Sequence, residues 1–147
     1  MRKGYFPGEI EAGPSYWQPL IEKSLENAVK YCEIDYWRSL FLEYLPMTGR
    51  IIEGGCRIGH YVVYCQNLGY DTYGVDKVYE PLHRVKQYQP DARVSLGDVR
   101  QLPFKSKSFK AYFSNGVAEH FEEGPLQVLR EAHRVLEDDG LLLITVP

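Results

Sequence analysis

The chain has 147 residues, of which 44% are hydrophobic and 25% charged, a composition typical of one folded domain with one core. Its formal net charge is -3 and it has no run of lysines or arginines, so a nucleic-acid substrate is disfavoured. The three cysteines have no C-x-x-C spacing, which argues against a disulfide framework and a zinc site, and we expect no bound metal.

Residues 1–17 are rich in glycine, proline and aromatic side chains, which is typical of an irregular arm. The chain opens with no apolar run long enough for a signal peptide or a membrane span, so the cytoplasm is the expected compartment and no membrane partner is expected. Two helices should follow, over 19–31 and 36–45. We therefore divide the single domain, 1–147, into an arm with helices, 1–46, and a core, 50–147.

From Arg50 onward, strand patterns alternate with helix patterns. This alternation predicts an α/β fold with a doubly wound, mostly parallel sheet of about five strands and right-handed crossovers. In such sheets, ligands bind beyond the carboxyl ends of the strands, where the strand order reverses. The expected strands are 50–53, 71–75, 92–96, 110–115 and 141–146, and the expected helices are 58–68, 79–88 and 123–137.

The most informative segment is IIEGGCRIG, Ile51 to Gly59, in which an apolar strand ends in an acid and a glycine-bearing turn. No frame of it supplies the dinucleotide fingerprint G-x-G-x-x-G. It is not a phosphate-binding loop either, because His60 and Tyr61 stand where that loop has lysine and a hydroxyl residue. About 17 residues after Gly59, a second apolar strand ends in Asp76, near the spacing at which an acid reaches a ribose diol.

Glu53, Gly55 and Gly59 stand at the positions of motif I, E/D-x-G-x-G-x-G, so the segment resembles the Rossmann-like (class I) S-adenosylmethionine-dependent methyltransferases. The resemblance continues in order through GVDKVYEPL, VSLGDVRQLPFKSKSFKAYFSNGVAEHF and EAHRVLEDDGLLLITVP, from roughly Arg50 to Pro147. It implies the Rossmann-like methyltransferase core, S-adenosylmethionine as the cofactor, and methyl transfer as the reaction.

The resemblance also implies roles for single residues. Glu53 would lie near the ammonium of the methionine part, and Asp76 would accept from both ribose hydroxyls. Asp98 would accept from the adenine amino group, with the Val99 amide beside the ring. The full expected cofactor-binding set is Glu53, Gly55, Cys56, Gly59, Asp76, Lys77, Asp98, Val99 and Asn115.

Plainer interpretations stay open for several of these residues. Glu53 and Asp76 could simply be polar residues at strand ends, and the Gly-Asp pair that contains Asp98 is a common turn signal. Cys56 is more simply loop filler than a nucleophile. His120, which follows the fourth strand, is the candidate catalytic base, although a packing or capping histidine fits equally well.

Two positions depart from the family pattern. Arg57 takes the place of the middle glycine of motif I, so its side chain must either point away from the cofactor or intrude on it. Lys110 stands at the start of the fourth strand, where many relatives have an acid.

The chain stops after the fifth strand, whereas relatives continue with further strands. We expect either a fragment or natural truncation, or a homodimer that buries the exposed fifth strand.

The leading interpretation is methyl transfer to a small-molecule acceptor. The alternative is a non-catalytic S-adenosylmethionine-binding or partner-dependent methyltransferase-like protein, which Arg57 and the missing C-terminal half favour. A nicotinamide-dependent oxidoreductase shares the strand layout but would need the glycine fingerprint that this chain lacks.

Overall fold

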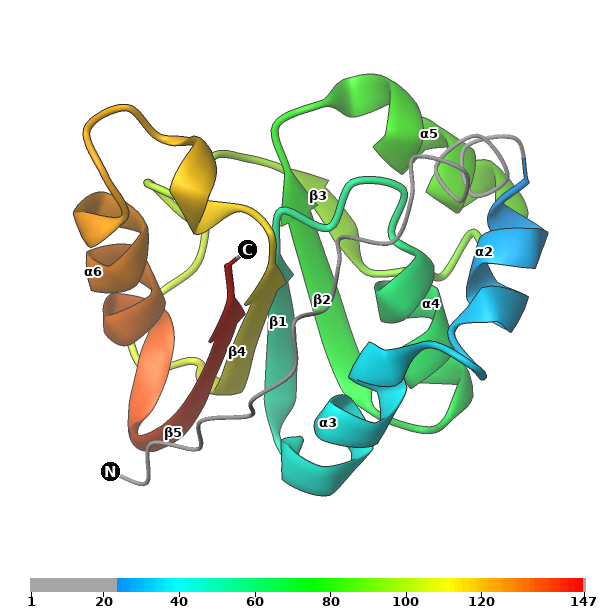
Figure 1. The fold of residues 1–147 in the computed structure, drawn as a ribbon, viewed down its shortest axis with the longest axis horizontal. Coiled ribbons are helices and arrows are strands. Elements are labelled where there is room, and N and C mark those ends of the chain that lie inside the picture. Colours follow the sequence, from blue (N-terminus) through cyan, green and yellow to red (C-terminus); the bar gives the residue numbers. More distant parts are fainter. Residues whose placement is uncertain (1–23, 147) are drawn as a thin grey trace.

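The computed structural model describes residues 24–146. They form one sheet of five parallel strands in the order β3-β2-β1-β4-β5 (Figure 1). The strands are β1 (Arg50–Gly54), β2 (Asp71–Asp76), β3 (Val94–Leu96), β4 (Phe109–Asn115) and β5 (Leu136–Thr145). The helices are α2 (Leu25–Tyr31), α3 (Tyr36–Tyr44), α4 (His60–Asn67), α5 (Tyr79–Tyr88) and α6 (Leu126–Val135), with a short 3-10 helix, η1 (Ala118–His120). The predicted α/β fold with a parallel sheet is confirmed.

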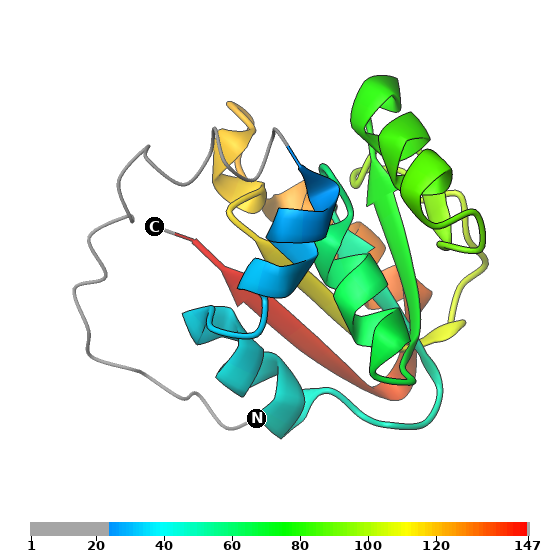
Figure 2. The ribbon, with the colours of Figure 1, turned by 90° about the vertical axis from the view of Figure 1, so that its right-hand side faces the viewer.

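Helices cover both faces of the sheet, with α2, α3, α4 and α5 on one side and α6 on the other (Figures 1 and 2). From β1 the chain first builds outward through β2 to β3, and then returns to place β4 on the other side of β1. The strand order therefore reverses between β1 and β4. This is the switch point at which the carboxyl ends of the strands leave room for a ligand.

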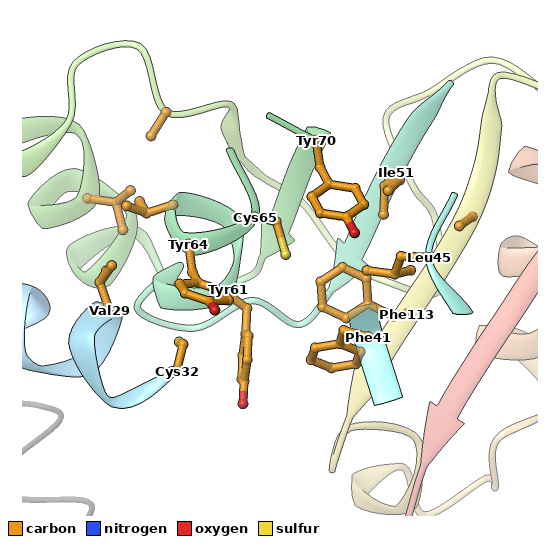
Figure 3. Close-up of a cluster of buried hydrophobic side chains, with 14 residues drawn as sticks. Val29, Cys32, Phe41, Leu45, Ile51, Tyr61, Tyr64, Cys65, Tyr70 and Phe113 are labelled. Atoms are coloured by element: carbon orange, nitrogen blue, oxygen red, sulfur yellow. The ribbon is translucent and has the colours of Figure 1, made fainter. Parts of the chain in front are cut away.

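The central strands β1, β2 and β4 are mostly buried, and the alternation of their side chains sorts these into two cores. On the α2–α5 face, Phe41 of α3 packs against Phe113 of β4 and Tyr61 of α4, with ring centroids 4.7 and 5.0 Å apart (Figure 3). On the α6 face, Tyr112 of β4 and Ala132 of α6 belong to the second core. Each large apolar side chain buried in this way stabilises the fold by about 1.5 to 3 kcal/mol.

Local capping explains where the first two described helices begin. The Ser24 hydroxyl accepts from the Asn27 amide at 3.3 Å, and the Asp35 carboxylate accepts from the Trp37 amide at 3.4 Å. The Tyr61 hydroxyl donates to the same Asp35 carboxylate and so ties the α3 cap to α4. The arm, 1–17, and the first part of the helix predicted over 19–31 lie outside the described residues.

Several element bounds differ from the sequence prediction. Helix α4 begins at His60 rather than 58, because Gly59 has a left-handed backbone with φ 63°. Helix α6 covers Leu126–Val135 rather than 123–137, and β5 starts at Leu136 rather than 141. The pairing then shifts register, from Leu136 opposite Phe109 to Leu141 opposite Ala111, so the acidic residues between them bulge from the ladder. A polar E-D-D-G segment gives no strand signal.

Lys110, the second departure from the family pattern, has a partner in this bulge. Its ammonium lies 2.6 Å from the Asp139 carboxylate and 3.6 Å from that of Glu137. The start of β4 thus carries the base and β5 carries the acids. We conclude that this departure is structural.

Glu53 is a carboxyl group buried in the core, with 4% of its surface exposed. Burial, reinforced by the nearby negative charge of Asp76, raises its pKa from 4.5 to about 8, although a hydrogen bond from the Val62 backbone acts in the opposite direction. Among the residues that the structure describes, Oε2 of Glu53 has no hydrogen-bond partner. The folded chain therefore holds this group protonated at neutral pH.

We expect Glu53→Gln to stabilise the ligand-free chain increasingly as the pH rises from 5 to 8. The folded-state pKa lies above the unfolded one, so the wild-type chain takes up a proton on folding and loses stability across this window. The variant cannot ionise, and its advantage should reach on the order of 3 to 5 kcal/mol near pH 8. Urea unfolding at pH 5, 6.5 and 8 measures the difference in free energy of unfolding between the variant and the wild-type chain. Glu80→Gln, at an exposed position, is the control. A difference that does not change with pH would contradict the raised pKa of Glu53.

Candidate functional site

A cavity of about 690 Å³ opens at the carboxyl ends of the strands, at the switch point. Its walls come from the loop after β1, the residues after β2 and β3, and the segment that follows β4 through η1. The lining residues are Gly55, Arg57, Asp76, Lys77, Val78, Gly97, Asp98, Val99, Arg100, Gly116, Val117, His120, Phe121, Glu122 and Glu123. Both acidic and basic residues therefore line the same cavity.

The glycine loop after β1 forms one wall. The amides of Gly55 and Cys56 donate to the Val75 carbonyl at 2.8 and 3.0 Å, which holds the loop against β2. Gly55 has φ 75°, and a Cβ there would lie 2.5 Å from a methyl of Val117. A larger residue would strain the backbone and push the two walls of the cavity apart.

Arg57, the residue in place of the middle glycine, adopts a left-handed backbone with φ 47°. A non-glycine residue in this region costs roughly 1 to 3 kcal/mol. Its amide donates to Oδ2 of Asp76 at 2.7 Å, and its exposed side chain lines the cavity. The departure from the motif therefore keeps the turn and adds a cation to the cavity wall.

Asp76 ends β2 with only 7% of its surface exposed. Its Oδ2 accepts from the Arg57 amide, and its Oδ1 accepts from the Val78 amide at 2.9 Å. Each carboxylate oxygen has two lone pairs, so both can still accept from a ligand. Lys77 lines the cavity beside it.

Asp98 and Val99, two of the predicted cofactor residues, follow β3 and line the cavity. The Asp98 carboxylate accepts from the Arg100 amide at 2.8 Å and from the Arg100 guanidinium, which lowers the pKa of this carboxyl. The Asp98 carbonyl also accepts from the Gln101 amide at 2.9 Å. Asp98 thus forms a turn and also lines the cavity, while its contact with adenine stays a prediction.

His120 lies at the end of η1, where its side chain is exposed and lines the cavity. The short helix follows the carboxyl end of β4 and brings His120 to the cavity wall. This position suits a group that meets a second ligand.

The roles of all nine predicted cofactor residues stay predictions, and four of the nine do not line the cavity: Glu53, Cys56, Gly59 and Asn115. Glu53 is buried on β1, Cys56 is buried within the glycine loop, and Gly59 forms the left-handed turn that starts α4. The Asn115 amide oxygen accepts from the Thr145 hydroxyl at 2.6 Å and joins the ends of β4 and β5.

Sequence reasoning missed several lining residues. Val78, Gly97, Gly116 and Val117 each follow a strand end, so their position after the strand was a usable signal. Phe121, Glu122 and Glu123 continue from the His120 segment. Arg100 carried no motif signal, because its role depends on partners in another loop.

All three cysteines are buried free thiols, and burial raises the pKa of each, that of Cys65 to about 12. Within residues 24–146, no cluster of three or more histidine, cysteine or acidic residues is placed to hold a metal ion. No helix in this range is long and apolar enough to cross a membrane.

Solved structures share this fold. Protein PH0226 from Pyrococcus horikoshii matches with a TM-score of 0.67 and 24% identity, over 95% of this chain and 63% of its own. An S-adenosylmethionine-dependent methyltransferase from Mesorhizobium loti matches with a TM-score of 0.65 and 23% identity, over 84% and 55%. YcgJ from Bacillus subtilis matches with a TM-score of 0.60 and 23% identity, over 84% and 50%. The chain thus spans between half and two thirds of the length of these proteins.

The sequence comparisons give two further results. No curated protein matches the chain. The model of the methyltransferase domain family matches residues 52–144, which include β2, β3 and β4, three of the five residues of β1, all but the last residue of β5, and every lining residue of the cavity. The chain therefore belongs to the methyltransferase domain family.

Proposed function

We propose that the cavity binds S-adenosylmethionine and that the chain transfers its methyl group to a small-molecule acceptor. The observation that carries the proposal is the Asp76 carboxylate, buried at the end of β2 at the switch point with lone pairs available on both oxygens. The family match supports the reaction class and favours it over a non-catalytic binder.

The lining fits the chemistry of this cofactor. S-adenosylmethionine has a ribose diol, an adenine edge, an amino acid head and a sulfonium, but no phosphate, so it needs acceptors more than a lysine-rich cradle. Asp76 supplies acceptors for the diol, Asp98 and the Val99 backbone face the base, and Gly55 leaves room for the chain of the amino acid. The cavity volume of about 690 Å³ lies within the usual range for small-molecule sites.

When bound, the cofactor supplies a methyl group on a positively charged sulfur. The contribution of the chain is alignment: Asp76 and the glycine loop fix the cofactor on one wall, while the segment after β4 receives the acceptor on the other. Proximity and orientation of this kind lower a barrier by roughly 7 to 11 kcal/mol. We propose that His120, which lines the cavity, takes the proton that the acceptor loses.

A small acceptor fits the size of the site and the net charge of -3, which gives no electrostatic footprint for nucleic acid.

The three free thiols suit a reducing compartment such as the cytoplasm. Strand β5 is at one end of the strand order, and Leu142 on it is 41% exposed, which supports pairing with a second copy of the chain.

Asp76→Ala should weaken S-adenosylmethionine binding by roughly 10- to 100-fold, since hydrogen bonds to a charged acceptor are lost. Calorimetric titration of the purified chain measures the loss, and circular dichroism verifies that the variant is folded. Asp76→Asn keeps one acceptor oxygen, so its affinity for S-adenosylmethionine should lie between those of the wild-type chain and Asp76→Ala. Asp71→Ala, at the other end of β2, is the matched control. Equal affinity of the wild-type chain and Asp76→Ala would refute the proposed site.

Arg57→Gly should improve the affinity for S-adenosylmethionine relative to its demethylated product by roughly two- to tenfold. The two ligands differ by the sulfonium charge, and the substitution removes a positive charge from the cavity wall while keeping the amide that binds Asp76. Paired titrations with both ligands give the ratio. An unchanged ratio would mean that the guanidinium points away from the sulfonium.

His120→Gln should lower turnover by roughly 10²- to 10⁴-fold while leaving the dissociation constant of S-adenosylmethionine unchanged. The assay is release of the demethylated product with a panel of small amines, phenols and thiols as acceptors. Glu119→Gln is the control, because Glu119 precedes His120 in η1 without lining the cavity. Equal losses in both variants would assign His120 a structural role.

A further inference from the structure

Arg100 joins two walls of the cavity. Its guanidinium contacts Asp98 through Nε, at 3.1 Å from Oδ1 and 3.2 Å from Oδ2, and through Nη2, at 2.8 Å from Oδ2. Its Nη1 donates to Oε1 of Glu123 at 2.7 Å, and its Cζ lies 4.8 Å from the centre of the Phe121 ring. Asp98 follows β3, whereas Phe121 and Glu123 follow β4, so one side chain spans the opening between these segments.

These contacts occupy the carboxylate that faces the base. Three N–H groups of Arg100 contact the Asp98 carboxylate: the amide at 2.8 Å from Oδ1, the Nη2–H at 2.8 Å from Oδ2, and the Nε–H, which is shared between both oxygens. A carboxylate has about four lone-pair positions, so Arg100 takes up most of them. A nucleobase amino group at Asp98 therefore competes with the guanidinium for the same carboxylate.

The bridge is exposed enough to exchange. About a third of the side-chain surface of Arg100 and of Asp98 is accessible, and half of that of Glu123. Ion pairs at this level of exposure are weak and screened by salt, so they open without unfolding the chain. Glu123 and the Phe121 ring keep the guanidinium at the cavity wall when Asp98 is released.

We propose that Arg100 competes with the nucleoside base for Asp98 and thereby determines the base selectivity of the cavity. The inference rests on the proposed function. With Arg100 in place, a 6-amino group finds its acceptor occupied, whereas a 6-oxo group meets a guanidinium donor. The wild-type site then discriminates weakly between adenine and hypoxanthine, and loss of Arg100 sharpens the preference for adenine.

The test is calorimetric titration of the wild-type chain and Arg100→Ala with S-adenosylhomocysteine and S-inosylhomocysteine, which differ at the 6-position of the base. Arg100→Ala should bind the adenine ligand roughly three- to tenfold more tightly, the effect of one hydrogen bond gained, and the hypoxanthine ligand more weakly. Glu123→Ala removes the bridge but leaves Arg100 on Asp98, so it should not tighten adenine binding. Arg93→Ala, which breaks the ion pair with Asp71 away from the cavity, is the matched control.

Equal or weaker adenine binding by Arg100→Ala, with the wild-type chain binding normally, would overturn the role of Arg100 and leave the proposed function standing. Tighter adenine binding by Glu123→Ala would overturn it as well, because the effect would then belong to the bridge. Absence of binding by every form of the chain would overturn the proposed function itself.

Discussion

The site depends on the carboxylate of Asp76, each oxygen of which accepts a hydrogen bond from a different backbone amide. One amide belongs to Arg57 in the glycine loop, and the other belongs to Val78 at the start of the crossover to β3. Since β1 and β2 pair in register up to Gly54 and Val75, this carboxylate fixes the loop relative to the sheet. The position of the glycine loop therefore depends on this side chain together with the backbone hydrogen bonds to the Val75 carbonyl.

The rest of the sheet supports that arrangement through packing on both faces. Phe113 and Tyr112 are adjacent on β4, yet they belong to different cores, one under α3 and α4 and one under α6. Such a strand cannot slip by one residue without exchanging the two faces. The fixed register consequently holds the strand ends, and the polar residues that follow them, in defined positions around the cavity.

The sequence was most informative for the strands and for the polar residues that directly follow them. The five strands, the parallel sheet and the cavity positions of Asp76, Asp98 and His120 were predictable, because apolar runs and the residues after them are local signals. The early start of β5 was not, because a polar bulge has no strand pattern. Nor was the role of Arg100, since it depends on Glu123, which lies 23 residues further along the chain.

The buried cysteines have a consequence for how the chain opens. Cys32 caps the carboxyl end of α2, Cys56 lies on the glycine loop and Cys65 lies on α4, and burial raises the pKa of all three thiols. Only the thiolate reacts with alkylating reagents, so labelling has to wait until the surrounding structure opens. The rate at which each of the three thiols is alkylated therefore measures how often the segment that contains it opens.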